Sequence, residues 1–145
     1  MIDKKKLGVM QGRLSNVFRN KIQSFPFFNW KQEFKLANEI GLRNIEWTID
    51  NYKYKRNPLL TINGNEEIQY LTKRYKIKIP SVTADFFMED KYFYYHRMNK
   101  YSKFFNFLDK CSENKINLIV VPLVDNSSVK NNKDYLKILI EDFKF

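Results

Sequence analysis

Short apolar segments alternate with longer segments of helical periodicity along the whole chain, and this alternation constrains the fold more than any other feature. The strand-like segments are residues 6–10, 44–48, 77–83 and 118–121, and the helix-like segments are residues 29–41, 61–75, 98–114 and 133–143. A strand followed by a helix and another strand is the βαβ unit of parallel sheets. The sequence therefore predicts an α/β fold of about four βα units in a single domain, residues 1–145.

The composition agrees with a folded domain and excludes several other classes of protein. The chain has 145 residues, of which 43% are hydrophobic, and this is enough for a packed core. A single cysteine excludes a disulfide scaffold and indicates a reducing compartment. The longest apolar run, residues 118–124, contains a proline and is far shorter than the roughly 18 residues of a membrane span. We therefore expect a cytoplasmic protein with no membrane partner.

The predicted helices carry recognisable end signals and apolar faces. Asn29 is a typical N-cap residue with Gln32 three positions later, as in a capping box, and Gly41 supplies a left-handed residue at the other end. In segment 61–75 we expect Ile68 and Leu71 to point inward. In segment 98–114 the expected apolar stripe and its neighbours are Met98, Tyr101, Phe105 and Leu108, with Phe104, Phe107 and Cys111 beside them.

The predicted connections after the strands are long, and those after the helices are short. The long ones are residues 11–28, 50–60, 85–97 and 125–132. In β/α barrels the loops that follow the strands build the active site. A doubly wound open sheet is the alternative fold, but there the first strand is followed by a glycine-rich phosphate loop, whereas here it is followed by Gln11, Gly12 and Arg13. We therefore expect a TIM-barrel type of fold, with the four units forming an N-terminal half barrel. The fourth strand is almost wholly apolar, so we expect it to be covered on both faces.

Polar and charged side chains recur near the ends of the predicted strands, where a barrel would bring them to one mouth. Glu46 is the most distinctive, because a carboxylate inside an apolar strand is costly unless it is paired or functional. We take it as the candidate catalytic residue. The candidate substrate-binding residues are Gln11, Arg13, Asp85, Asp125 and Asn126. Turn formation or capping by the two aspartates is the ordinary alternative.

Several motifs in order along the chain resemble the start of a sugar phosphate isomerase/epimerase of the xylose isomerase-like TIM-barrel superfamily. They are LGVMQGRL at residues 7–14, IQSFP at 22–26, GLRNIEW at 41–47, NPLL at 57–60, IPSVTADFFM at 79–88 and VPLVDNSS at 121–128. The resemblance implies a divalent metal (Mn, Mg, Co or Zn) that holds sugar oxygens while a carboxylate moves a proton through an enediolate. The expected partner is a sugar or sugar phosphate.

The same resemblance implies that the metal ligands are not in this chain. In relatives these ligands are Glu, Asp, His and Glu from later strands of the barrel, so no metal ligand is assigned here. A complete barrel takes about 250 residues. The chain is therefore expected to be a piece of a longer enzyme, a truncated and inactive remnant, or one part of a barrel that a second copy or a separate C-terminal half completes. A non-catalytic binding or subunit module is the alternative function, and the chain alone is expected to be inactive.

The formal net charge of +10 does not by itself identify a partner. Lysines are spread along the whole chain, which favours biased codon usage over a nucleic-acid surface. Residues 91–101 interleave basic and aromatic side chains, but we expect them to cover the barrel mouth or enter a helix. His96 is the only histidine, whereas an apurinic endonuclease-type zinc site needs several. We expect no nucleic-acid partner.

Overall fold

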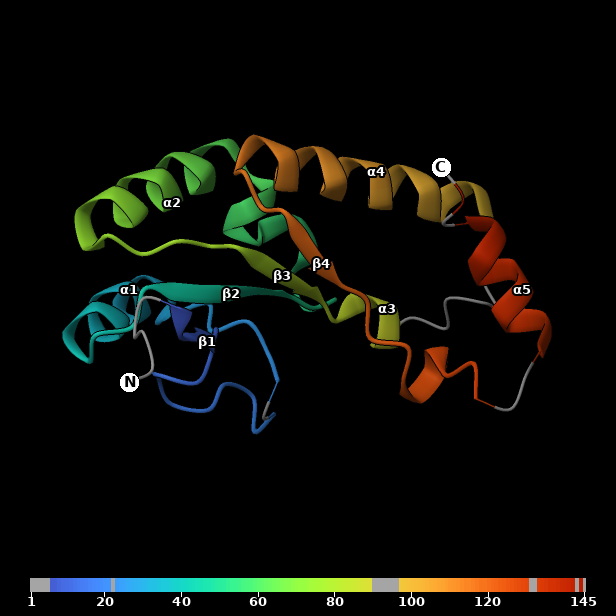
Figure 1. Cartoon of the computed structure of the whole chain (residues 1–145), viewed down its shortest axis with the longest axis horizontal. Helices are drawn as coiled ribbons and strands as arrows, with labels where there is room; N and C mark the ends of the chain where they lie inside the picture. The colour runs from blue at the N-terminus through green and yellow to red at the C-terminus, as the bar shows by residue number, and fades with distance from the viewer. Residues whose placement is uncertain (1–5, 22, 90–96, 131–132, 143, 145) are drawn as a thin grey trace.

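A computed structural model describes residues 6–21, 23–89, 97–130, 133–142 and 144, with only the backbone of residues 97–102. In this part of the chain, parallel strands form one sheet in the order β1-β2-β3-β4 (Figure 1). The strands are β1 (Gly8–Met10), β2 (Asn44–Ile49), β3 (Ser81–Ala84) and β4 (Leu118–Val120). This confirms an α/β chain whose helices alternate with the strands of a parallel sheet.

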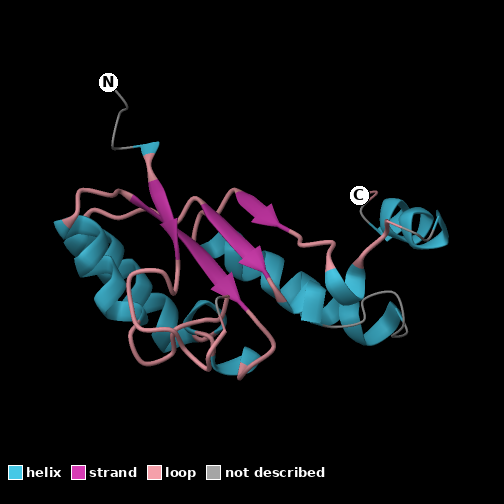
Figure 2. Cartoon of the chain, turned by 90° about the horizontal axis from the view of Figure 1, so that it is seen from below, coloured by secondary structure: helices cyan, strands magenta, loops and turns pink. Residues whose placement is uncertain are grey.

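Three helices between the strands lie on one side of the sheet: α1 (Trp30–Glu39), α2 (Ile62–Tyr75) and α4 (Arg97–Glu113). The short α3 (Phe86–Glu89) follows β3, and α5 (Lys133–Asp142) follows β4. Short 3₁₀ turns are η2 (Tyr54–Arg56), η3 (Pro58–Leu60) and η4 (Asp125–Ser127). Figure 2 shows α1, α2 and α4 beneath the strands, with no described helix over the opposite face. We call the covered face the helix side and the opposite one the inner face.

The core lies between the helix side of the sheet and the helices, and it is rich in aromatic rings. Trp47 of β2 is fully buried, with its ring centroid 5.4 Å from that of Phe25 and 5.6 Å from that of Trp30. Its indole Nε1 donates to Asn57 Oδ1 at 3.0 Å, so its polar atom is also satisfied. Ile68 and Leu71 are buried in the same core, as the sequence predicted.

The N-terminus of α1 differs from the sequence prediction, whereas its C-terminus agrees. Gly41 has φ of +84°, the predicted left-handed conformation. Asn29, however, makes no side-chain cap, because its φ and ψ of −120° and −1° lie outside the extended region that capping requires. The backbone carbonyl of Pro26 accepts hydrogen bonds from the Asn29 and Trp30 N–H groups instead. The predicted capping box is therefore wrong.

α2 has the side-chain cap that α1 lacks, and this difference can be measured. Thr61 has extended backbone angles, and its Oγ1 accepts a hydrogen bond from Gly64 N at 3.1 Å. We expect Thr61→Ala to lower the free energy of unfolding by about 1 kcal/mol. Asn29→Ala should lower it by less than about 0.5 kcal/mol. Urea denaturation of both variants checks this, and equal losses would contradict the assignment of the caps.

The third and fourth strands are shorter than predicted, and the fourth is less covered than predicted. Lys78 forms only an isolated bridge with Asn44, and regular pairing begins after Pro80. Leu118 and Val120 of β4 are 59% and 38% exposed. The prediction that β4 is covered on both faces is therefore wrong, because no described helix crosses the inner face.

The apolar face of α4 is also rotated relative to the predicted stripe. Phe107 and Cys111 are buried, whereas Phe105 is 46% exposed. The side chains of Met98 and Tyr101 lie outside the described residues. Burial raises the pKa of the Cys111 thiol to about 12, as suits a core thiol. None of the described helices is long and apolar enough to span a bilayer.

Candidate functional site

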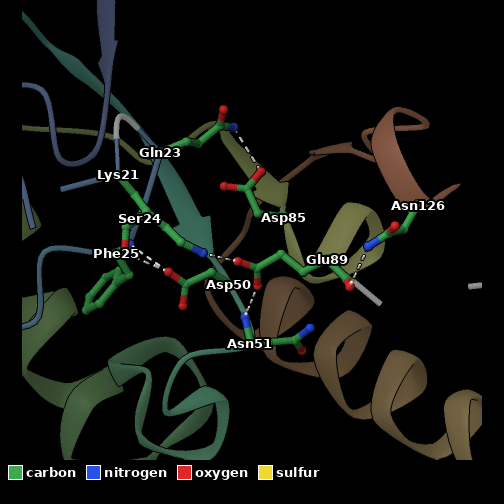
Figure 3. A network of polar contacts seen from close by, with 9 residues as sticks. All are labelled: Lys21, Gln23, Ser24, Phe25, Asp50, Asn51, Asp85, Glu89 and Asn126. Atoms are coloured by element: carbon green, nitrogen blue, oxygen red, sulfur yellow. Dashed lines mark hydrogen bonds and ion pairs between the residues drawn. The ribbon is translucent and has the colours of Figure 1, made fainter. Parts of the chain in front are cut away.

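Two aspartates follow neighbouring parallel strands and meet at the carboxyl edge of the sheet (Figure 3). β2 and β3 end side by side, with Ile49 paired to Ala84, and the next residue on each strand is Asp50 or Asp85. Glu89 of α3 brings a third carboxylate to the same place. We call Asp50, Asp85 and Glu89 the carboxylate cluster. Only Asp85 of the three was predicted from the sequence.

Each aspartate of the cluster uses one carboxylate oxygen and leaves the other without a partner among the described residues. Asp50 Oδ2 accepts from Ser24 Oγ at 2.9 Å and from Phe25 N at 3.2 Å. Asp85 Oδ1 accepts from Gln23 Nε2 at 2.9 Å. Asp50 Oδ1 and Asp85 Oδ2 have no hydrogen bond, although the two residues are only 3% and 1% exposed. Such buried, unsatisfied oxygens are uncommon and costly.

Glu89 ties the loops around the cluster together. Its Oε1 forms an ion pair with Lys21 Nζ at 3.2 Å, and its Oε2 accepts a hydrogen bond from Asn51 N at 2.7 Å. Asn126 Nδ2 donates to the backbone carbonyl of Glu89 at 3.4 Å. The loops after all four strands therefore contact one another at this edge of the sheet.

Burial and mutual repulsion change the proton affinity of the cluster. Desolvation, followed by the negative charges of Glu89 and Asp50, raises the pKa of Asp85 to about 7. Desolvation also raises the pKa of Asp50, although hydrogen bonds from Phe25 and Ser24 oppose the shift. Asp85 can therefore exchange a proton near neutral pH, as a general acid or base must.

Glu46 lies on the inner face, in the middle of the sheet rather than at its carboxyl edge. Its two carboxylate oxygens accept from Ser81 Oγ at 2.8 Å and from Thr83 Oγ1 at 2.7 Å. Asp50 comes four positions after Glu46, about 13 Å along β2. It borders a hollow of about 300 Å³ beside β1. The catalytic role predicted for Glu46 stays a prediction.

The two candidates from the first loop have different positions. Gln11 is buried, and its Oε1 accepts from Thr48 N at 3.3 Å, so it joins β1 to β2. Its Nε2 and the Thr48 hydroxyl have no partner among the described residues. Arg13 is exposed, with its guanidinium 3.6 Å from Met10 Sδ. Of the two, only Gln11 adds a buried polar atom near the strand ends.

The candidates after β4 are both exposed. Asp125 begins η4 with a positive φ of 50°, and its backbone carbonyl accepts from Ser128 N, so it forms a turn. Asn126 reaches the cluster only through the backbone of Glu89. The buried Ser127 hydroxyl donates to the Phe87 carbonyl and holds η4 against α3. His96 and the aromatic segment at residues 91–96 lie outside the described residues.

Glu33 of α1 is a buried carboxylate that the sequence prediction missed. It accepts from Gly12 N at 2.8 Å, from Leu14 N at 3.2 Å and from Ser15 Oγ at 2.8 Å. Burial raises its pKa, although these hydrogen bonds oppose the shift. Its position between Trp30 and Ala37 on the buried helical face was the available signal. Glu33 fixes the loop that carries Gln23 and Ser24 toward the cluster.

The metal implied by the family resemblance stays a prediction, since the resemblance assigns its ligands to later strands that are not in this chain. The described residues contain no group of three or more His, Cys, Asp or Glu side chains placed to hold a metal ion. No chemical step is therefore derived through a metal. Comparison of the chain with protein-family models, with curated proteins and with solved structures found no match.

Proposed function

We propose that the chain is a half barrel of the sugar phosphate isomerase/epimerase type, which contributes substrate-binding and proton-carrying side chains. The observation that carries this proposal is the pair Asp50 and Asp85 at the ends of neighbouring parallel strands. Both are nearly fully buried, and each has one oxygen without a hydrogen-bond partner among the residues that the structure describes. A ligand with several hydroxyl groups supplies the hydrogen bonds that these oxygens lack.

The arrangement of the sheet supports the barrel type over a doubly wound sheet. A doubly wound sheet reverses its strand order at a switch point and has helices on both faces. Here the strands follow one another in sequence order, and the described helices between them cover one face. In a barrel the carboxyl edge forms the mouth that holds the active site, and the inner face forms the interior beneath it. Glu46 would then lie beneath the carboxylate cluster, on the floor of the substrate site.

Asp85 suits proton transfer at the carbon beside a sugar carbonyl. With a pKa of about 7, part of the population carries a carboxylate and part a carboxylic acid at neutral pH. The carboxylate takes the proton from that carbon, and the C–H electron pair forms the enediolate. Return of this proton to the former carbonyl carbon, while a hydroxyl proton passes between the two oxygens, gives the isomer. Protonation of the original carbon on its opposite face by a second acid or by solvent gives the epimer.

Proton exchange with solvent tests this proposal directly. The chain is incubated in D₂O with a panel of pentoses, hexoses and their phosphates, and deuterium at the carbon beside the carbonyl is followed by NMR. The family resemblance implies that the chain alone is inactive, but the position and raised pKa of Asp85 lead us to expect exchange with at least one sugar. Asp85→Asn and Glu46→Gln should each reduce it by about 100-fold or more. Glu66→Gln, which changes an exposed carboxylate on α2, is the matched control and should leave it unchanged.

The possible outcomes separate an enzyme from a binding module. Binding of a sugar without exchange in the wild-type chain would identify a non-catalytic module, with the carboxylate cluster as its binding site. Exchange that survives both Asp85→Asn and Glu46→Gln would place the chemistry elsewhere. Neither binding nor exchange with any sugar would refute the proposed substrate class.

A further inference from the structure

The two outer strands of the sheet each pair on one side only in the described chain. β1 pairs with β2, and β4 pairs with β3. An unpaired strand edge presents N–H and C=O groups that are available to another chain. Because all four strands are parallel, β4 of one copy has the direction needed to pair with β1 of a second copy.

Exposed apolar side chains are frequent in the part of the chain from β4 to α5. Of the twelve exposed large hydrophobic residues in the described chain, five belong to β4, to α5 or to the segment between them: Leu118, Val120, Val124, Leu136 and Ile140. A sixth, Leu7, immediately precedes β1. Exposed apolar groups that gather at one place mark an interaction surface.

A hollow lies beside each of these edges. The one beside β1, of about 300 Å³, extends over the inner face to the start of β3 and is lined by Gly8, Met10, Glu46 and Ser81 among others. The one beside β4, of about 400 Å³, is lined by Ile119, Val121, Leu123, Leu139 and Ile140. The lining residues of the first include polar and charged ones, and those of the second are all apolar.

The side chains at each edge suit the hollow at the other. Residues paired across parallel strands point to the same face of the sheet. Met10 pairs with Glu46 in β2, and the Glu46 carboxylate accepts a hydrogen bond from Ser81 in β3. Ser81 in turn pairs with Leu118, so Leu118 lies on the inner face, as does the hollow beside β1. Val9 alternates to the helix side, where Ile119 and Val121 line the other hollow.

We propose that these edges are the two halves of one self-complementary interface, through which two copies of the chain close into an eight-stranded parallel ring. β4 of each copy pairs with β1 of the other. Leu118 and Val120 of one copy lie on the inner face beside Gly8 and Met10 of the other, at the rim of the hollow beside β1, and Leu7 and Val9 of that strand cover the hollow beside β4. The interface does not depend on the proposed reaction.

Symmetry makes such a small edge sufficient. A two-fold axis produces two identical seams, so each seam needs to bury only about half of the roughly 800 Å² per partner of a stable interface. The net charge of +10 on each copy opposes association. Because the seams are apolar and backbone-mediated while the opposing force is electrostatic, added salt should strengthen the dimer.

Sedimentation velocity over a range of protein and NaCl concentrations tests the interface. We expect a monomer–dimer equilibrium that shifts toward the dimer as NaCl is raised. Leu118→Lys should weaken dimerisation by about 100-fold or more, because both seams carry the lysine. Ile62→Lys, on a side chain of α2 that is 75% exposed, is the matched control and should dimerise like the wild-type chain. Both side chains are exposed, so both variants should fold.

Hydrogen exchange provides a second measurement. Amides of residues 8–10 and 118–120 should exchange more slowly when the wild-type chain is dimeric, and Leu118→Lys should abolish this protection. A monomer at every protein and salt concentration would overturn the proposal. Equal weakening by Leu118→Lys and Ile62→Lys would also overturn it, as would open-ended oligomers that grow with concentration.

Discussion

Replacing Glu33 by alanine is expected to lower the free energy of unfolding by about 3 kcal/mol, a large effect for a polar side chain on a helix. Glu33 accepts hydrogen bonds from two backbone N–H groups and from the Ser15 hydroxyl, and it is only 1% exposed. Alanine leaves these donors without their acceptor and leaves a void beneath the loop. The midpoint of urea denaturation measures the loss.

Two further variants separate the hydrogen bonds of Glu33 from its charge. Glu33→Gln keeps one acceptor oxygen and the shape of the side chain, so it should lose about half as much free energy as Glu33→Ala. Glu39→Ala, on the same helix, removes an exposed carboxylate 3.7 Å from Lys35 and should cost less than about 0.5 kcal/mol. Similar losses for Glu33→Ala and Glu39→Ala would show that Glu33 does not hold the loop.

The alternation of strands and helices was predictable because it depends on local periodicity. Glu33 shows the limit of that approach, because the helical period places it on the apolar face but does not show what a carboxylate there would bind. Whether a loop distant in sequence packs against the helix and binds this carboxylate depends on long-range contacts, which local periodicity does not show. The prediction that β4 is covered on both faces was wrong for a similar reason. An apolar strand shows that its side chains avoid water, but it does not show which faces the helices cover.

The candidate site was only partly predictable, because its geometry depends on strand register. Asp85 was found because it follows an apolar strand-like segment. Asp50 occupies the equivalent position after β2, but the predicted strand ended at residue 48 and left it in a loop. Glu46 was grouped with the strand ends, whereas pairing with β3 places it beside Ser81, at the beginning of that strand. The partners Gln23 and Ser24 come from a loop without any periodicity.

Asp85→Asn is expected to stabilise the chain at pH 8 and to remove most of its loss of stability between pH 4 and pH 7. The pKa of Asp85 is about 7 in the folded chain and about 3.9 in an unfolded one. Below pH 4 both states hold the proton. As the pH rises toward 7 the unfolded state releases it first, so the free energy of unfolding falls by up to about 4 kcal/mol.

Asparagine cannot ionise, so it avoids this penalty while keeping an oxygen for the hydrogen bond from Gln23. The raised pKa values of Asp50 and Glu33 act in the same direction and should leave a smaller slope in the variant. Urea denaturation of the wild-type chain, Asp85→Asn and the exposed control Asp125→Asn at pH 4.5 and pH 8 measures the difference. The control should behave like the wild-type chain. A loss of stability for Asp85→Asn at pH 8 would mean that the ionised carboxylate is stabilised in the folded chain, for example by a bound cation, and that Asp85 is not the proton-carrying group.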